Sequence, residues 1–301
     1  MLTLLGEFHT ARRRDWLLLA HGSTLGSSHG RSHAEPQLDP RRSGSPQGAA
    51  GAPAYDVSLD LARDEATFGS QATIRFTSGD GTTFLNLRPV TLHRIRLDGA
   101  DLDVDRLENS RFPLTLTAGE HLLEVDATMP FRNDGEGLHR SVDPTDGKPY
   151  VYGMSFMDAA PTIFACFDQP DLKAPYTFQV TAPTDWVVRA NAAGTQDAPG
   201  HWVFEPSQPL STYFVTLVAG PYHVIETEHD GIALGLLARA SLATQLEEQA
   251  EEIFTITKQS FDEQHRLFGI RYAFGKYDQC FVPEFNAGAM ENPAASRSAT
   301  A

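Results

Sequence analysis

The chain has 301 residues, of which 41% are hydrophobic, and this is enough for about two domains with apolar cores. Its net charge of −15 argues against a nucleic-acid partner, because phosphate binding depends on clustered Lys and Arg. The longest apolar runs, such as residues 16–20, are far shorter than the roughly 20 residues of a membrane span, so we expect no membrane partner. Cys166 and Cys280 have no metal or disulfide spacing and indicate free thiols in a cytoplasmic protein.

Residues 1–53 are predicted to be a disordered or mis-started N-terminal extension. Gly, Ser, Pro, Arg and His dominate from residue 21 onward, and no apolar period persists beyond a few residues. His29 and His33 have the one-turn spacing of a zinc-binding helix. The surrounding sequence cannot sustain a helix, however, and no Glu follows the first His, so we predict no metal site there.

A β-rich domain is predicted over residues 54–232. Tyr55, Val57 and Leu59 alternate with polar residues, as in a half-buried strand, and residues 72–76 repeat the pattern before a turn at 78–81. Short runs separated by turn signals favour an antiparallel sandwich or saddle. Further strands are predicted at residues 84–87, 92–97, 114–116, 122–127, 176–180, 186–188, 201–204 and 211–219.

Residues 150–173 interrupt the β pattern. Aromatic and turn residues are mixed there too closely for a plain strand. We therefore predict a loop that covers the sheet and faces a second domain.

From about residue 233 the pattern becomes helical, and a second, α+β unit is predicted over residues 233–292. Apolar residues recur at steps of three and four from Leu242 to Phe268, with a solvated acidic face opposite. A capping box at residues 244–247 would begin this helix and Gly269 would end it. A strand is expected at residues 270–274.

The segment Gly288-Ala289-Met290-Glu291-Asn292 carries the chemistry that we expect. A peptidase that removes single residues can add the substrate backbone to an exposed strand edge and capture its α-ammonium with a carboxylate. Small residues at 288 and 289 would let that backbone approach, and Glu291 would pair with the ammonium. Taken alone, a Glu beside an Asn is more often a surface or capping residue.

This pentapeptide resembles the GAMEN signature of the zinc aminopeptidases of the aminopeptidase N family. The block Phe164-Ala-Cys-Phe-Asp-Gln-Pro-Asp-Leu-Lys-Ala174 is similar to a second motif of the same enzymes. The resemblance covers about residues 54–292. It implies a mainly β saddle domain followed by the start of an α+β, thermolysin-like catalytic domain.

The resemblance also implies roles for individual residues. Asp168 and Lys173 would help to pack domains together, and Glu291 would bind the substrate amine. The family usually places a second amine-binding Glu or Gln twelve residues before the Asp of the Asp-Gln-Pro triplet, and Phe156 stands there instead. We therefore expect a rearranged anchor or an altered substrate preference. The substrate-binding residues implied are Gly288, Ala289, Met290 and Glu291.

The zinc site of the family is not predicted in this chain. Its enzymes bind Zn²⁺ through a His-Glu-x-x-His helix and a further Glu, and the metal polarises the scissile carbonyl and activates water. None of the eleven His residues lies in such a motif, and none follows His265. We therefore predict no catalytic residue, no metal ligand and no bound cofactor here, and an inactive chain.

Residues 293–301 are predicted to be a frameshifted tail. In the family, the pentapeptide commonly continues as Pro-Gly-Cys-Val-Thr-Phe-Arg-Asp. When one G is deleted from suitable codons for that run, they read Pro-Ala-Ala-Ser-Arg-Ser-Ala-Thr, which is the sequence of residues 293–300.

These observations predict the N-terminal portion of a cytoplasmic zinc aminopeptidase. The intact enzyme would use Zn²⁺ to release neutral or basic N-terminal residues from peptides with a free N-terminus. Its oligomeric state is left open. Two alternatives are a non-catalytic β domain that binds peptides or a partner, and a pseudogene product.

Overall fold

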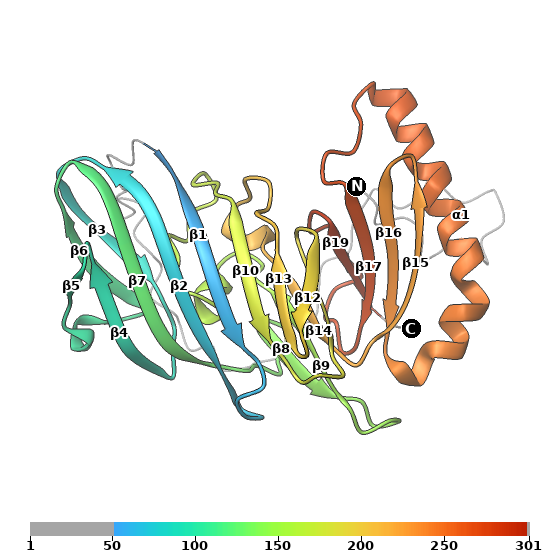
Figure 1. Cartoon of the computed structure of the whole chain (residues 1–301), viewed down its shortest axis with the longest axis horizontal. Coiled ribbons are helices and arrows are strands. Elements are labelled where there is room, and N and C mark those ends of the chain that lie inside the picture. Colours follow the sequence, from blue (N-terminus) through green and yellow to red (C-terminus); the bar gives the residue numbers. More distant parts are fainter. Residues whose placement is uncertain (1–50, 300–301) are drawn as a thin grey trace, which may run out of the picture. The chain divides into compact units, whose positions relative to one another are not determined.

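The computed structural model describes residues 51–299 of the chain. The predicted extension lies outside this part except for its last three residues, which belong to the first strand, β1 (Gly51–Asp60). Strands dominate the described residues, as predicted. They form three larger sheets and one two-stranded sheet, together with one long α-helix in this part of the chain (Figure 1).

The largest sheet has eight strands in the order β12-β13-β10-β1-β2-β7-β4-β5. Strand β1 pairs antiparallel with β2 and parallel with β10. The predicted alternation is confirmed, because Tyr55, Val57 and Leu59 are buried while Asp56 is exposed. The other strands are β2 (Thr67–Ser78), β4 (Thr91–Leu97), β5 (Ala100–Asp101), β7 (Gly119–Pro130), β10 (Tyr176–Thr181), β12 (Gly194–Ala198) and β13 (His201–Phe204).

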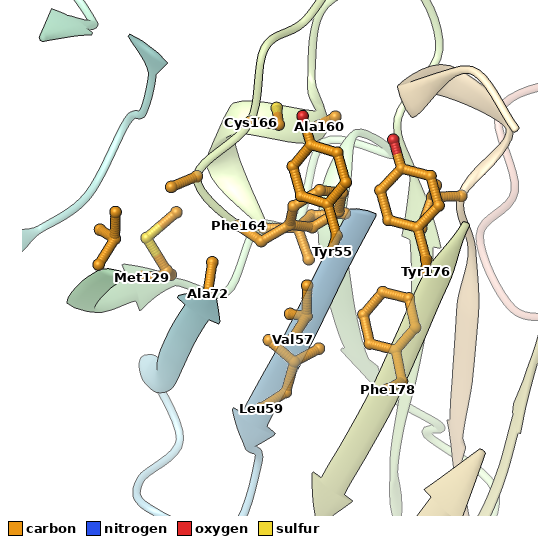
Figure 2. Close-up of a cluster of buried hydrophobic side chains, with 14 of the residues drawn as sticks. Tyr55, Val57, Leu59, Ala72, Met129, Ala160, Phe164, Cys166, Tyr176 and Phe178 are labelled. Carbon is orange, nitrogen blue, oxygen red and sulfur yellow. The ribbon is translucent and has the colours of Figure 1, made fainter. Parts of the chain in front are cut away.

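The main hydrophobic core joins this sheet to β3 (Gly81–Asn86), β6 (Arg111–Leu116) and the segment around residue 164. The rings of Tyr55 and Tyr176 stack with 4.8 Å between their centroids, and Phe164 meets both rings edge-on (Figure 2). The second sequence motif, which begins at Phe164, therefore contributes to the core of the β domain.

A four-stranded sheet has the order β11-β14-β9-β8. The prediction of a loop from residue 150 is wrong at its start, because β9 continues to Met154. Both faces of β9 are buried, with Val151 in the main core and Tyr152 in a second hydrophobic cluster, so the strand lacks the expected alternation. The strands are β8 (Gly137–Val142), β9 (Pro149–Met154), β11 (Val187–Ala190) and β14 (Leu217–Gly220).

The strand predicted at residues 211–219 is also shorter in the structure. A 3₁₀ turn at Thr212–Phe214 occupies its first half, and only Leu217–Gly220 is extended and paired. Asn191 holds this turn by donating from Nδ2 to the carbonyl of Phe214 at 3.0 Å. The hydrogen bond from Asn191 thus holds this segment in a turn, whereas the local sequence favours a paired strand.

The third sheet carries the segment that resembles the family signature. Its order is β15-β16-β17-β19-β18, with β16, β17 and β19 parallel. One face packs against α1 (Ala243–Phe268) through residues such as Leu236 and Phe254, and the other face adds Leu237 and Cys280 to the second cluster. The strands are β15 (His223–His229), β16 (Ile232–Ala238), β17 (Lys276–Val282), β18 (Ala289–Met290) and β19 (Ala295–Ala299).

The helix α1 confirms the predicted amphipathic pattern and its end, since Gly269 caps it in the left-handed conformation with φ 63°. The predicted capping box is not formed. A 3₁₀ turn at Ala240–Leu242 precedes the helix, and its first N–H is bound by the hydroxyl of Tyr150 at 2.9 Å. The hydroxyl of Tyr150 therefore accepts a hydrogen bond at the start of the helical segment, in place of the side-chain cap that the sequence predicted.

The strand predicted at residues 270–274 is wrong. These residues lie outside any strand, and β17 begins only at Lys276. Gly269 and Gly275, both with positive φ, flank the segment, and Tyr272 packs its ring edge-on against Phe261 of α1, 5.1 Å away. Tyr272 and Phe274 thus serve an aromatic cluster rather than a ladder, while Ile270 is exposed. Among the described residues, no helix is long and apolar enough to cross a membrane.

Candidate functional site

The predicted substrate-binding residues lie at the edge of the five-stranded sheet. Ala289 and Met290 form β18, which pairs antiparallel with Ser298 and Arg297 of β19 and is the last strand in the sheet order. Gly288 is exposed, and a side chain there would meet no described atom within 4 Å. The structure therefore brings these residues together on an edge whose outer side has no paired strand among residues 51–299.

Glu291 and Asn292, which follow β18, differ in their surroundings. Glu291 is exposed, whereas Asn292 is buried and donates from Nδ2 to the carbonyl of Phe214 at 2.9 Å. Asn191 donates to the next carbonyl, that of Pro293, at 2.8 Å. The backbone is thus fixed immediately after Glu291 while the Glu291 carboxylate stays open to solvent.

The residues after Asn292 form an integral part of this sheet. Strand β19 runs parallel to β17, and Ser296 donates from Oγ to the carbonyl of Met290 at 3.1 Å. Arg297 is fully buried in this strand, and Ala294 adopts φ 65°. The segment predicted as a frameshifted tail therefore supplies the only described partner strand of β18.

The loop between β17 and β18, residues 283–288, is held by a group of residues that the sequence did not single out. His139 on β8 is buried and its ring stacks on that of Tyr152 on β9, with 4.7 Å between centroids. The Tyr152 hydroxyl donates to the carbonyl of Glu284 at 3.2 Å. A polar residue inside a strand was the only sequence signal for His139, and such a signal is too common to identify a site.

Asp168 and Lys173, two further residues of the second motif, differ in burial. Asp168 accepts a hydrogen bond from Oγ1 of Thr212 at 2.5 Å, and burial raises the pKa of its carboxyl group. Lys173 is exposed. Phe156, at the position of the expected second anchor, has φ 33° and a 52% exposed side chain, so it offers an apolar surface where the resemblance leads us to expect a polar one.

Within residues 51–299, no group of three or more His, Cys, Asp or Glu side chains is placed to hold a metal ion. A zinc site needs three or four such ligands. These residues therefore do not fit the zinc that the family resemblance implies.

A cavity of about 670 Å³ lies away from β18. Its lining includes Arg189, Glu226, Lys276 and Asp278, and none of residues 288–291. Four of its charged groups form pairs: Arg189 lies 2.8 Å from Glu226, and Lys276 lies 2.5 Å from Asp278. The cavity is distinct from the edge at β18.

The described residues thus form a β-rich fold with an open edge strand at β18. Residues 52–214 match the family model of the Peptidase M1 N-terminal domain, and the chain belongs to the M1 peptidase family. Aminopeptidase N of Streptomyces lividans is 42% identical over 251 residues, which cover 80% of this chain and 29% of that protein. Glutamyl aminopeptidase of Homo sapiens is 26% identical over 266 residues, which cover 79% of this chain and 27% of that protein.

A third relative is similar over a larger part of its own length. Aminopeptidase N of Acetobacter pasteurianus is 26% identical over 258 residues, which cover 79% of this chain and 71% of that protein. All three relatives are aminopeptidases by name, as the sequence motifs predicted. The chain spans less than a third of the Streptomyces and human relatives.

Proposed function

We propose that this chain binds the N-terminal end of a peptide along the outer edge of β18, with Glu291 pairing with the peptide α-ammonium. The observation that carries the proposal is the contrast between Glu291, which is exposed at the end of an edge strand, and Asn292, which is buried and hydrogen-bonded. The residues that would line the peptide are Gly288, Ala289, Met290 and Glu291.

The physical basis is strand addition combined with charge recognition. An exposed strand edge offers backbone hydrogen bonds to any extended peptide, so it supplies affinity without strong sequence preference. The α-amino group has a pKa of about 7.7–8.0 and is mostly protonated at neutral pH. A single carboxylate beside the edge would therefore favour peptides that present a free N-terminus over internal segments.

We further propose that the binding segment belongs to a cytoplasmic zinc aminopeptidase. In that reading the β domain covers residues 54–232, residues 233–292 begin the catalytic domain, and residues 293–301 are a frameshifted tail. When bound, the zinc of the intact enzyme would activate water for hydrolysis. Because residues 51–299 do not fit that metal, the chain as it stands is expected to bind peptides without cleaving them.

Calorimetric titration tests the binding proposal. We expect alanyl-alanyl-alanine amide to bind the full chain and its N-acetylated form to bind at least about tenfold more weakly, because acetylation removes the charge that Glu291 recognises. The variant Glu291→Gln should weaken binding of the free peptide to the level of the acetylated one. Glu65→Gln, an exposed carboxylate elsewhere, is the matched control for net charge. Equal binding of both peptides would refute the proposal.

A non-catalytic binding domain is the second candidate, and the described donor set favours it for this chain alone. Release of nitroaniline from alanyl-p-nitroanilide, measured with added zinc, tests the expected inactivity of the chain. Turnover by the purified chain would contradict the expected inactivity. Binding without turnover agrees with both the binding domain and the fragment of an enzyme, whereas absence of binding agrees with a product without function.

A further inference from the structure

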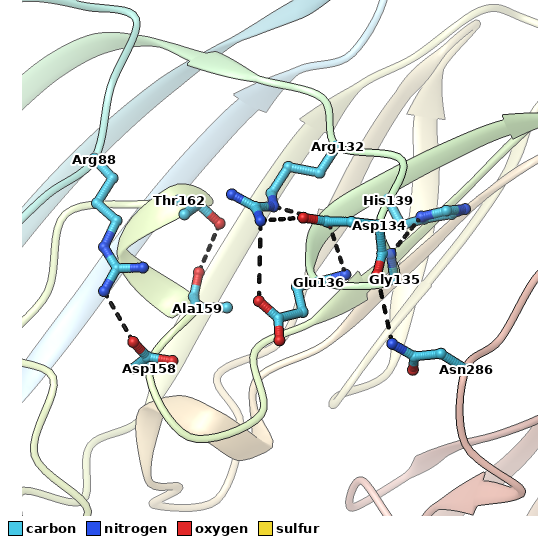
Figure 3. Close-up of polar contacts among 10 residues, drawn as sticks. All are labelled: Arg88, Arg132, Asp134, Gly135, Glu136, His139, Asp158, Ala159, Thr162 and Asn286. Atoms are coloured by element: carbon cyan, nitrogen blue, oxygen red, sulfur yellow. Dashed lines mark hydrogen bonds and ion pairs between the residues drawn. The ribbon is translucent and has the colours of Figure 1, made fainter. Parts of the chain in front are cut away.

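The loop that leads into β18, residues 283–288, contacts the four-stranded sheet and the turn before β8 through several consecutive residues. The carbonyl of Glu284 accepts a hydrogen bond from the Tyr152 hydroxyl at 3.2 Å. The ring of Phe285 meets the Tyr152 ring edge-on, with 5.6 Å between centroids. Asn286 donates from Nδ2 to the carbonyl of Asp134 at 3.5 Å (Figure 3). Three consecutive loop residues are thus each tied to the β8–β9 region.

His139 lies at the centre of these contacts. Its side chain is 1% exposed, and its Nδ1 accepts a hydrogen bond from the N–H of Gly135 at 3.0 Å (Figure 3). In the neutral imidazole the proton must therefore lie on Nε2. That atom is 3.3 Å from Oε2 of Glu284, in a contact that is not aligned as a hydrogen bond. One face of the same ring supports Tyr152.

The turn at residues 134–135 approaches the side chain of Asn286 closely. Gly135 has φ 86°, and a Cβ atom there would lie 2.4 Å from Nδ2 of Asn286. Glu284 itself has φ 53°, which is uncommon for a residue other than glycine. The path of the loop is therefore determined by its contacts with the other sheet, because its own backbone preferences do not favour it.

We propose that His139 is a positioning residue that, through Tyr152 and the turn at Gly135, fixes the 283–288 loop and thereby the place of the β18 edge and Glu291. This inference rests on the proposed peptide-binding function. A loop that is already ordered does not have to lose conformational freedom when the peptide arrives, and this loss is one of the main costs of binding. His139 contributes to affinity in this way without touching the peptide.

Hydrogen exchange of the full chain tests the positioning role directly. In His139→Leu the Gly135 N–H loses its acceptor and Tyr152 loses its stacking partner. We expect amide exchange of residues 284–291 to accelerate by at least about tenfold, while amides in the pairing of β2 and β7 stay protected. His139→Asn, which keeps an acceptor near Nδ1, should restore part of the protection.

His121→Leu is the matched control. His121, on β7 of the largest sheet, is also buried, and its two ring nitrogens contact Asp98 and the carbonyl of Thr117. It should change exchange near those residues and leave 284–291 unaffected. The proposal is overturned if His139→Leu loosens the whole molecule as uniformly as a general loss of stability would, or leaves 284–291 unchanged.

A milder variant and a binding measurement complete the test. Tyr152→Phe removes only the hydroxyl that holds Glu284 and should accelerate exchange at Ala289 and Met290, which pair with β19, even if His139→Leu does not fold; unchanged exchange there would overturn the proposal. Binding of alanyl-alanyl-alanine amide should weaken about tenfold in His139→Leu, in step with the loss of loop protection. If the native chain does not bind this peptide, the proposed function fails, whereas the exchange experiment still decides the positioning role.

Discussion

Arg297 donates a hydrogen bond from Nη2 to Oδ1 of Asn292 at 2.5 Å, and both side chains are buried. The Nε and Nη1 atoms of Arg297 have no hydrogen-bond partner among the described residues. The guanidinium lies 5.6 Å from the ring centroid of Phe285 and forms no ion pair within this part of the chain. Burial lowers the pKa of Arg297 to about 10, so the group is still charged at neutral pH. A buried cation with so few partners destabilises the fold.

Replacing Arg297 by Met should therefore stabilise the protein. The substitution loses the hydrogen bonds to Oδ1 of Asn292 and to Sδ of Met154 and removes the desolvated charge, and we expect a net gain of roughly 1–3 kcal/mol in the free energy of unfolding. Urea unfolding at pH 7 measures it. The control is Arg271→Met at the exposed ion pair with Asp230, where the change should stay within about 0.5 kcal/mol. If Arg297→Met lowers the free energy of unfolding instead, the contacts of the guanidinium outweigh the cost of burying its charge.

Ala294 provides a second test in the same segment. It is buried and has φ 65°, a region that a Cβ atom disfavours and that glycine enters freely. Ala294→Gly should raise the free energy of unfolding by about 1 kcal/mol. The neighbouring Ala295 is extended in β19, and Ala295→Gly should lower stability by a similar amount. Two changes of the same sign would contradict the backbone argument.

The buried charge of Arg297 and the positive φ of Ala294 both fall in the segment for which we propose a shifted reading frame. The continuation Pro-Gly expected from the family resemblance places Gly at position 294, where the backbone favours it. It places Thr at position 297, where a buried guanidinium now lies. These two positions support the proposal from backbone strain and charge burial, which are independent of the codon comparison.

The sequence predicted much of the fold where one face of an element is buried. The alternation in β1 and the long period of α1 were both read correctly because solvent and core lie on opposite sides of these elements. Strand β9 was missed because it is buried on both faces, and the segment 270–274 was misread because its Tyr272 and Phe274 rings serve an aromatic cluster. Local pattern cannot distinguish such cases, since the deciding contacts come from distant residues.

The candidate site was predictable only in part, for a similar reason. The motif identified Gly288, Ala289, Met290 and Glu291, which are contiguous. His139 and Tyr152 come from strands more than 130 residues earlier in the chain, and each would be an ordinary core residue on its own. Their link to Glu284 exists only through the packing of one sheet against the other.

The stability of the protein should depend on pH through His139. Burial lowers the pKa of this imidazole below the usual value, and the nearby carboxylates of Glu284 and Asp134 offset the shift only in part. The unfolded chain therefore takes up this proton more readily. The contribution of neutral His139 to stability is complete above about pH 6.5 and decreases as the pH falls below that value, by at most about 1.4 kcal/mol per pH unit.

Urea unfolding of the native chain and of His139→Asn at pH 7.5 and 5.5 measures this effect. The native chain should lose more stability over that interval than the variant, because only the native chain has this imidazole. His121, whose pKa is raised by its contacts with Asp98 and Thr117 despite burial, has the opposite dependence but is common to both proteins and cancels. Parallel pH profiles for the two proteins would contradict the assignment.

The reactivity of the Cys280 thiol should show how readily β19, with its buried charge at Arg297, opens. Burial raises the pKa of the Cys280 thiol to about 12 and that of Cys166 well above its usual range, so neither forms the reactive thiolate near pH 8. Cys280 stands opposite Arg297 in the pairing of β17 with β19, whereas Cys166 lies in the main core. Opening of β19 alone would expose Cys280, and a strand with a buried unpaired charge should open more readily than the core.

We therefore expect a thiol reagent at pH 8 to modify the folded chain at least about a hundredfold more slowly than the unfolded chain, and to reach Cys280 before Cys166. Mass spectrometry of digested samples identifies the order. Arg297→Met should slow the modification of Cys280, because it removes the buried charge that favours opening of β19. If Cys166 reacts before Cys280, the main core is the weaker part.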